Sequence, residues 1–405
     1  MKYRITTLLA TSATAALLCA GAAWADDQAA PAPAAAPAAA PAAAPAPSPM
    51  PYPSMTPPIS ANPNPATFDA GPLLGKLTVD GVLTGGGFYQ SNPAYNAYGR
   101  LNKDSYGDIT NAQVIVNKSD GPVQFYIQAG AYSIATLGTP YYRSSSFDRN
   151  TFGFVPQGFL KLVPNSSFSI EVGALPTLIG AEYTFSFENM NIERGLLWNQ
   201  EPAISKGVQV NYAKGPLAVS VAWTDGYYSN TYSALSGNLT YTFKNSDTLV
   251  FAGEGNVTTN RVSTFVTPSP QNNGQIYNII YTHTQGAWVI TPYVQYSNSP
   301  NNAVSTSGSS WGFAVLTKYN FTPEVSLSGR GEYITSSGHA NLLGYGSGSN
   351  AWSLTLTPAY QKGIFFVRGE VSYVGAGSTT PGDVFGADAT ADTQYRIMGE
   401  AGIVF

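Results

Sequence analysis

The sequence has little cysteine and little charge. Cys19 is its single cysteine, and charged residues make up only 10% of the 405 residues. One cysteine cannot form an internal disulfide, so a disulfide framework is excluded as the basis of the fold. In soluble domains about a quarter of the residues are charged. The deficit here indicates that much of the protein surface does not face water.

Long hydrophobic runs and an excess of basic residues are also lacking. Beyond the N-terminal segment, no apolar run approaches the roughly 20 residues that a transmembrane helix needs. The formal net charge of −4 provides no basic surface for nucleic acid. The two histidines and the single cysteine form no cluster with metal-ligand spacing. We therefore expect no nucleic-acid partner, no metal and no cofactor.

The N-terminal segment has the features of an export signal. Lys2 and Arg4 precede an apolar run over residues 5–20, and small residues flank Trp24 just before the first acidic residues. A basic start, a short apolar segment and a small-residue site are typical of a cleaved secretory signal. The sequence therefore predicts a signal peptide over residues 1–25.

Residues 26–70 form a second segment, rich in proline and alanine. Dense proline opposes both helix and sheet and favours the extended polyproline conformation. We expect a periplasmic linker here, either a solvated tail or a spacer that reaches towards the cell wall. The domain proper is then expected over residues 71–405.

Alternation of apolar and polar residues is the main pattern that is present, and the C-terminal segment shows it most clearly. Side chains alternate between the two faces of a strand. One face of 394–405 is apolar and includes Tyr395, Ile397 and Phe405, whereas the other carries Arg396 and Glu400. A strand with an apolar face, a charged face and a terminal aromatic residue is typical of an outer-membrane β-barrel.

The same alternation recurs along the chain in segments of about the length of a tilted transmembrane strand. The expected strands cover residues 76–90, 109–118, 122–133, 155–163, 167–174, 205–213, 216–225, 234–244, 248–257, 274–284, 286–297, 310–320, 323–335, 350–361, 363–374 and 394–405. Tight turns and long connections alternate between them without a break. Tight turns on one side and long loops on the other are typical of an up-and-down barrel with periplasmic turns and outer loops.

We therefore predict an all-β fold, a transmembrane antiparallel up-and-down β-barrel of about 16 strands. Mid-strand charges fall on the polar face, as they must if the apolar face contacts lipid. A soluble sandwich or a secreted β-solenoid is the alternative, but such folds expose their charged face. Pro292 and Pro358 lie within expected strands, where a missing N–H implies a bulge or an error in the strand assignment.

The connection over 175–204 is too apolar for a solvated loop. We expect it to fold into the barrel lumen, with a short helix over 189–198; an outer lid is the alternative. Folding inwards would place a first set of charged residues at the pore constriction. These residues are Glu182, Glu188, Glu193, Arg194 and Glu201.

A second set of charged residues lies on the inward face of the C-terminal strands. Rings of charge in a pore set its ion preference, but ion pairs that brace the wall would use the same residue types. The two interpretations both remain open. The residues of this second pore-lining set are Lys318, Arg330, Glu332, Arg368, Glu370, Arg396 and Glu400.

One segment matches a catalytic motif in its residue pattern. Residues 308–312 have the Gly-x-Ser-x-Gly pattern of a hydrolase nucleophile, with Ser310 at its centre. That motif requires a strand–turn–helix context and a histidine after the acidic residue, and neither His283 nor His339 follows Asp383. We therefore expect no catalytic residues and no enzyme activity.

Three segments around the long connection, 172–182, 189–195 and 207–211, resemble the beta-barrel porin-2 family, which is OmpL-like. The resemblance implies an outer-membrane porin-like barrel, and it implies no catalytic residue. The strand number and the inward loop are also similar to those of general diffusion porins, which is an analogy of fold alone.

These observations together predict a porin-like channel in the outer membrane of a Gram-negative bacterium, for passive diffusion of small hydrophilic solutes. A non-conducting barrel plugged by 175–204, with a binding or structural role, is the alternative, and a barrel hydrolase is the least favoured. The expected partners are outer-membrane lipid and small hydrophilic solutes or ions. Association into a homo-oligomer is compatible with the sequence.

Overall fold

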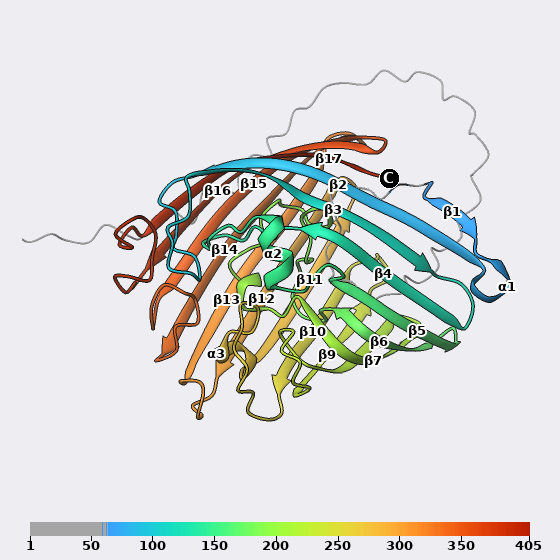
Figure 1. The fold of residues 1–405 in the computed structure, drawn as a ribbon, viewed down its shortest axis with the longest axis horizontal. Helices are drawn as coiled ribbons and strands as arrows, with labels where there is room; N and C mark the ends of the chain where they lie inside the picture. Colours follow the sequence, from blue (N-terminus) through green and yellow to red (C-terminus); the bar gives the residue numbers. More distant parts are fainter. Residues whose placement is uncertain (1–58, 60–61, 63) are drawn as a thin grey trace, which may run out of the picture. The chain divides into compact units, whose positions relative to one another are not determined.

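The computed structural model describes residues 59, 62 and 64–405. The predicted signal peptide over 1–25 lies outside the described residues, and so does the predicted linker up to residue 58. The regular secondary structure of the described chain is almost entirely β-sheet (Figure 1). No helix in this part is long and apolar enough to cross a membrane.

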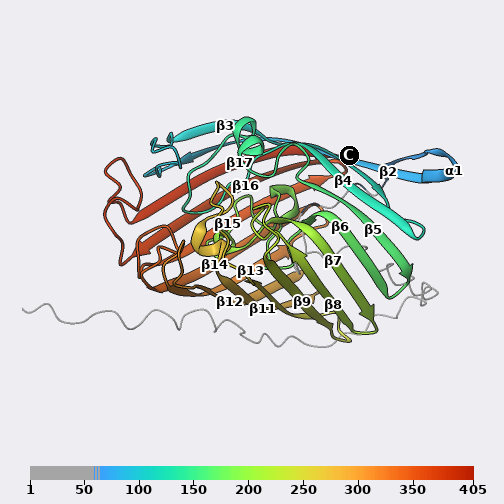
Figure 2. The ribbon, with the colours of Figure 1, turned by 60° about the horizontal axis from the view of Figure 1, so that its bottom comes forward.

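Sixteen strands of the described chain form a closed antiparallel barrel, as predicted (Figures 1 and 2). Each strand pairs with the next along the chain, and β17 pairs with β2 to close the wall. The strands are β2 (Lys76–Gln90), β3 (Ser105–Lys118), β4 (Val123–Tyr132), β5 (Gln157–Asn165), β6 (Phe168–Pro176), β7 (Ile204–Lys214), β8 (Leu217–Thr224), β9 (Ala234–Thr242), β10 (Thr248–Asn256), β11 (Gln275–Gln285), β12 (Trp288–Ser299), β13 (Gly308–Asn320), β14 (Val325–Gly338), β15 (Asn350–Lys362), β16 (Phe365–Gly377) and β17 (Thr393–Val404).

A short hairpin precedes the barrel. Strand β1 (Ala66–Asp69) pairs antiparallel with the first residues of β2, and the single-turn helix α1 (Gly71–Leu74) connects the two. The sequence had assigned 66–69 to the linker. These four residues contain no proline, so their backbone N–H groups are free to pair with β2.

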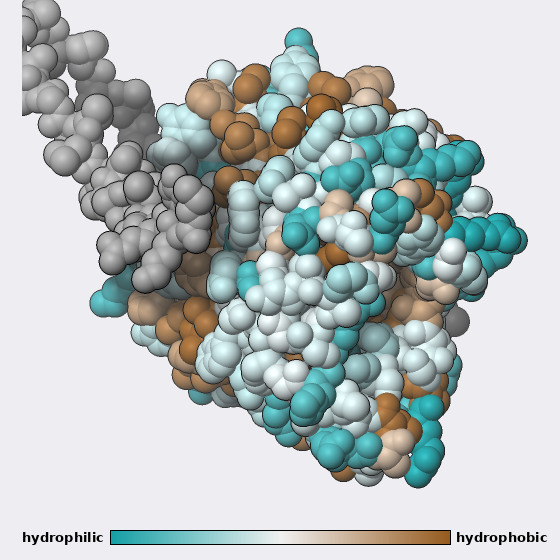
Figure 3. Space-filling view, turned by 90° about the vertical axis from the view of Figure 1, so that its left-hand side faces the viewer, coloured by the Kyte–Doolittle hydropathy of each residue, from teal (hydrophilic) through white to brown (hydrophobic). Residues whose placement is uncertain are grey.

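Apart from α1, the helices of the described chain are short and lie in the long connections. They are α2 (Ser144–Asn150), α3 (Ser269–Asn272) and the single 3₁₀ turns η1 (Ser186–Glu188) and η2 (Trp198–Gln200). Seen from the end that carries these connections, the surface is mostly hydrophilic, with hydrophobic patches at its margin (Figure 3).

The outer face of the wall is apolar. On β16, Val367 and Val371 are exposed, whereas Arg368 and Glu370 between them are buried inside. Aromatic pairs lie on the outer face near both ends of β12 and β13, at Trp288–Tyr319 and at Tyr296–Trp311. An exposed apolar band between aromatic girdles is the surface that a lipid bilayer requires.

The two prolines within strands produce no bulge, so that expectation was wrong. Pro292 pairs in register with Val315, and Pro358 pairs with Leu327. On its other side each proline, which has no N–H to donate, interrupts the ladder over two residue pairs, and the pairing then resumes in the same register. The register does shift at Thr84 and Gly85 of β2.

The inside of the barrel is not polar throughout. Inward residues of β10 to β14 form a buried apolar cluster, which the sequence pattern did not reveal. Apolar side chains at inward positions of neighbouring strands pack like a protein core rather than lining a water-filled channel. Its members on the wall include Val250, Ile276, Ile280, Val289, Tyr293, Leu316 and Ile334.

Candidate functional site

The connection between β6 and β7, residues 177–203, lies inside the barrel, and we call it the inward loop. Its atoms form hydrogen bonds with inward side chains of β14, β15, β16 and β17. Its apolar side chains are sheltered as predicted: Ile179, Met190 and Leu197 are fully buried against the apolar cluster of the wall. The predicted long inward-folded loop is therefore confirmed.

Carboxylates of the wall accept hydrogen bonds from the backbone of the inward loop. The N–H groups of Ile192 and Glu193 donate to Glu370 on β16, at 2.5 Å and 3.0 Å. The Asn191 amide donates to Thr357 at 2.7 Å, and that hydroxyl donates to Glu370. One wall carboxylate thus fixes three consecutive residues of the loop, two directly and one through Thr357.

The next part of the loop repeats this arrangement. The N–H groups of Leu196 and Leu197 donate to Glu332 on β14, at 3.0 Å and 3.2 Å. The N–H of Gly195 donates to Glu182 at 2.8 Å. These bonds satisfy backbone N–H groups that would otherwise be buried without partners.

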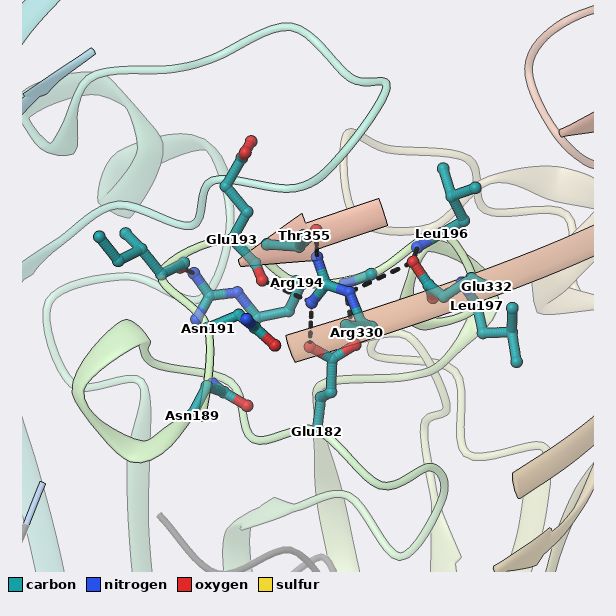
Figure 4. A network of polar contacts seen from close by, with 12 residues as sticks. Glu182, Asn189, Asn191, Glu193, Arg194, Leu196, Leu197, Arg330, Glu332 and Thr355 are labelled. Carbon is teal, nitrogen blue, oxygen red and sulfur yellow. Dashed lines mark hydrogen bonds and ion pairs between the residues drawn. The ribbon is translucent and has the colours of Figure 1, made fainter. Parts of the chain in front are cut away.

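Arg330 of β14 connects the loop to the wall at the centre of this network (Figure 4). Its guanidinium bonds Glu182 at 2.7 Å and the carbonyl of Glu193 at 2.7 Å. It also forms an ion pair with Glu332 at 3.3 Å and donates to Thr355. All of these charged side chains are buried, so the charge of Arg330 is balanced by carboxylates within the barrel.

Arg368 and Arg396 fix the two flanks of the loop. Arg368 pairs with Glu400 and donates to the carbonyls of Ser186 and Asn189, at 3.0 Å and 2.9 Å. The Ser186 hydroxyl also donates to Glu400 at 2.8 Å. Arg368 and Glu400 are register partners on the neighbouring strands β16 and β17, so their bonds attach the loop to both strands of the wall.

Arg396 of β17 pairs with Glu193 of the loop at 2.6 Å. The same guanidinium donates to the carbonyl of Thr136 at 2.9 Å, and Ser372 donates to Glu193 at 2.6 Å. Thr136 belongs to the connection between β4 and β5, so that connection also reaches into the barrel. Two connections therefore meet the inward charges of the last strands.

The short helix expected over 189–198 does not form, and that prediction was wrong. In a helix the N–H of Ile192 or Glu193 would bond a carbonyl four residues earlier. Here those N–H groups bond the wall carboxylate Glu370 instead. The segment is an irregular chain whose backbone groups are satisfied by charged side chains, with single 3₁₀ turns at its flanks.

The network brings together eight of the twelve charged residues that the sequence assigned to the pore. Whether they contact a solute stays a prediction, because their charges are engaged with each other and with the loop backbone. These eight are Glu182, Glu193, Arg330, Glu332, Arg368, Glu370, Arg396 and Glu400.

Arg194 lies beside the network without a carboxylate partner in the described structure. Its guanidinium donates to the carbonyls of Ile192 at 2.7 Å and Ala135 at 3.3 Å. The backbone of Arg194 also pairs with the connection between β4 and β5 at Thr136. This arginine therefore joins two connections rather than presenting its charge to the lumen.

The three remaining predicted residues are separate from one another. Glu188 accepts a hydrogen bond from the backbone of Phe185 at 3.3 Å, within the loop. Glu201 is buried, and among the described residues neither of its oxygens has a hydrogen-bond partner. Burial raises the pKa of Glu201 well above its usual range, and the nearby carboxylates add to the shift. Lys318 lies on β13 opposite Ser328, two residues nearer the periplasmic turn than the level of Arg330.

The wall across from these strands carries polar side chains that the sequence analysis did not select. Gln128 donates to Gln113 at 2.6 Å, and Gln209 donates to Glu171 at 3.2 Å. Lys161 pairs with Glu171 at 2.9 Å. The amides occupy alternate positions of β3, β4 and β7, so the alternation itself was the signal that could have identified them.

A closed antiparallel barrel with an apolar outer face, short turns on one side and an inward loop defines an outer-membrane protein of the porin class. The chain matches the family described as "Putative beta-barrel porin-2, OmpL-like" over residues 76–405, and it belongs to this family. It is therefore a porin-like channel of the Gram-negative outer membrane, and its apolar outer face contacts lipid. A search of curated proteins finds no match.

Solved structures with the same fold are distant in sequence. OmpT, an outer membrane protein of Vibrio cholerae, is 14% identical, with 84% of this chain and 100% of that chain covered and a TM-score of 0.55. The anion-selective porin from Comamonas acidovorans is 9% identical, with 81% and 99% covered and a TM-score of 0.54. The channel DcaP of Acinetobacter baumannii is 12% identical, with 81% and 97% covered and a TM-score of 0.52. At these identities the likeness shows the fold alone.

Proposed function

We propose that this porin passes small hydrophilic solutes and ions by passive diffusion, and that the inward loop is its constriction. One observation carries the proposal: the loop backbone is bonded to wall residues Glu332 and Glu370 inside the barrel. A segment held in this way narrows the lumen permanently, because the wall and the loop fold as one unit. The charges of the network then shape the constriction through the loop, and they set ion preference only weakly.

The conducting path in this proposal follows the polar inward residues of β3 to β9, beside a small apolar cluster of Tyr126, Phe159 and Leu175. The apolar cluster of β10 to β14 fills the other side together with the inward loop. Hydrated solutes avoid a dry apolar surface. The amides of Gln113, Gln128 and Gln209 are buried and hydrogen-bonded to neighbouring side chains, so in this proposal they replace a solute's water contacts by exchanging those bonds. Lys161 and Glu171 would then be the charged pair closest to the path.

Planar-bilayer recording with the purified, folded protein tests the channel directly. We expect stepwise conductance, and the absence of steps would contradict the proposal. Lys161→Glu is expected to shift the reversal potential in a salt gradient towards cation selectivity, because a positive charge beside the path becomes negative. Lys362→Glu, at the exposed end of β15, makes the same charge change away from the lumen. Equal reversal potentials for the two variants would place the path elsewhere.

A plugged barrel is the second candidate, and the burial of the network favours it. Glu193 and Arg194 are fully buried, and no wall charge of the network is left without a partner among the described residues. A lumen sealed in this way would bind or support structure instead of conducting. It predicts no steps from the intact protein and clear steps once the inward loop is shortened.

The proposal includes no enzyme activity. The Ser310 hydroxyl lies against Gln200 and Ser297, at 2.9 Å and 2.8 Å, which gives it no general base. His283 bonds Asp247 at the periplasmic side of β11. The pKa of Asp247 is lowered by the hydroxyl of Tyr281 first and by His283 second, so this pair holds a charged carboxylate at the turn.

Homo-oligomer formation is a further part of the proposal. An in-vitro folded OmpT of Vibrio cholerae is recorded in a trimer form, and it is 12% identical to this chain with a TM-score of 0.53. The exposed apolar faces of the strands could pack against a second barrel as well as against lipid. Support for the oligomer comes from this likeness of fold.

A further inference from the structure

Glu254 is an inward carboxylate of the wall for which the described structure provides no partner. It lies near the outer end of β10 with an exposed fraction of 7%. No described residue forms a hydrogen bond or an ion pair with it, whereas Glu332, Glu370 and Glu400 are each bonded to the loop or to arginine. A buried carboxylate is destabilising unless donors or a positive charge satisfy it.

The carboxylate of Glu254 lines a cavity at the outer mouth of the barrel, between the inward loop and the outer connections. The cavity has room for a group about the size of a water molecule. None of its lining residues in the described structure is basic. Other polar residues that line it are Gln200, Tyr227, Gln271, Ser297 and Asn298.

Gly226 and Asn272 lie beside this cavity without lining it. The φ of +52° at Gly226 favours glycine, and a Cβ added there would lie 3.0 Å from Cβ of Ala234, 3.5 Å from Oε1 of Glu254 and 3.8 Å from Oδ1 of Asn272. The amide nitrogen of Asn272 donates to the carbonyl of Val262, which leaves Oδ1 to accept. Two acceptor oxygens thus lie near one position, which the Cβ of Ala234 bounds on another side and which a side chain at Gly226 would occupy.

The rest of the lining suits an organic cation. The Tyr227 hydroxyl donates to the carbonyl of Gln200, which fixes its ring at the edge of the cavity. The amide nitrogen of Gln271 donates to the carbonyl of Asn199, so its side-chain oxygen is left as an acceptor. An aromatic ring beside acceptor oxygens is the environment in which an ammonium group is bound.

We propose that Glu254, Asn272 and Tyr227 form a binding site for a small primary ammonium group at the outer mouth of the barrel. The carboxylate neutralises the charge and the amide oxygens accept the N–H hydrogens. A divalent metal fits less well, because Ca²⁺ takes about six to eight oxygen ligands. The described chain has no group of three or more acidic, His or Cys side chains placed to hold a metal. The site goes beyond solute diffusion and does not depend on conductance.

Ligand-detected NMR with methylammonium and the full, detergent-folded chain tests this site. We expect saturable binding to the wild type and an affinity about tenfold lower or worse in Glu254→Gln, because the variant loses a charge-assisted hydrogen bond; tenfold corresponds to about 1.4 kcal/mol. Gly226→Ala should weaken binding as well, because its Cβ occupies the space. Glu324→Gln, in an exposed periplasmic turn, is the matched control and should bind as the wild type does.

The controls separate folding from binding. Each variant is first shown to be folded by its resistance to heat in a detergent gel, and Gly226→Ala provides a second variant should Glu254→Gln not fold. Methylammonium binding that is absent from the wild type, or equal in the wild type and Glu254→Gln, would overturn the site. Complete displacement by Ca²⁺ at equal concentration would assign it to a metal ion and overturn the ammonium assignment. These outcomes are independent of whether the barrel conducts.

Discussion

Shortening the inward loop is expected to raise the single-channel conductance several-fold. The loop occupies the lumen and is bonded to wall residues such as Glu332 and Glu370, so its removal leaves an open barrel. The network charges on the wall would then face water. We also expect the network charges to give clear ion selectivity only in this variant, because arginines and glutamates that now bond the loop would be free to act on ions.

The barrel offers a simple way to make this variant. Pro176 and Ile204 are register partners on β6 and β7, so a linker of a few Gly and Ser residues can join them without moving the strands. Shortening the outer connection between β12 and β13 is the control, because its ends at Ser299 and Gly308 are also register partners. Planar-bilayer conductance that is the same in both variants and the wild type would show that the inward loop does not limit the path.

Replacing Arg330 by Met is expected to destabilise the barrel by about 3–5 kcal/mol. The change leaves Glu182 and Glu332 buried without their shared positive charge, and removing one partner of a buried ion pair has an effect of about this size. It also removes the bond to the carbonyl of Glu193. The free energy of unfolding can be measured by urea titration in lipid vesicles, followed by tryptophan fluorescence.

Two further variants test the physical reason. Adding Glu182→Gln to Arg330→Met should recover part of the loss, because one of the two uncompensated charges is gone. Lys362→Met removes a positive charge at the exposed end of β15 and should change stability by less than about 1 kcal/mol. A loss below about 1 kcal/mol in Arg330→Met would mean that the network does not hold the loop.

The barrel was predictable because its signals are local. Alternation with a period of two marks a strand wherever it occurs, and the chemistry of turns such as that at Lys214 and Gly215 separates one strand from the next. All sixteen predicted strands are present, with ends within four residues of the observed ones. The apolar C-terminal face around Tyr395 also proved to be the outer face.

The interior was less predictable. The position of a residue in the alternation shows which face of the wall it is on, but it does not show which residues it contacts there. Ile276 and Ile280 lie on the inward face, and only the packed structure shows that they form a core with Leu197. Likewise, the sequence does not show which charged residues contact one another. That Glu370 would bond the backbone of Ile192 depends on contacts between residues 178 positions apart.

The predicted helix over 189–198 failed for the same reason. The local sequence indicates whether a segment prefers a helix to a chain exposed to water. It does not show that wall carboxylates such as Glu332 accept hydrogen bonds from the backbone N–H groups. The irregular chain is stabilised because its N–H and carbonyl groups are paired with Glu332, Glu370 and Arg368.

Disulfide cross-linking tests the central claim, that the inward loop packs on the inner wall, most directly. A Cβ added at Gly312 of β13 would lie 2.9 Å from Cγ of Leu197, where the sulfur of a cysteine would be, so Leu197→Cys with Gly312→Cys has the geometry of a disulfide. Phe313 is next along β13 and faces outwards with an exposed fraction of 48%. We expect the peptides of 197 and 312 to be joined after oxidation, as detected by mass spectrometry, and no joining of 197 to Phe313→Cys. No cross-link at 312, or an equal one at 313, would contradict the account.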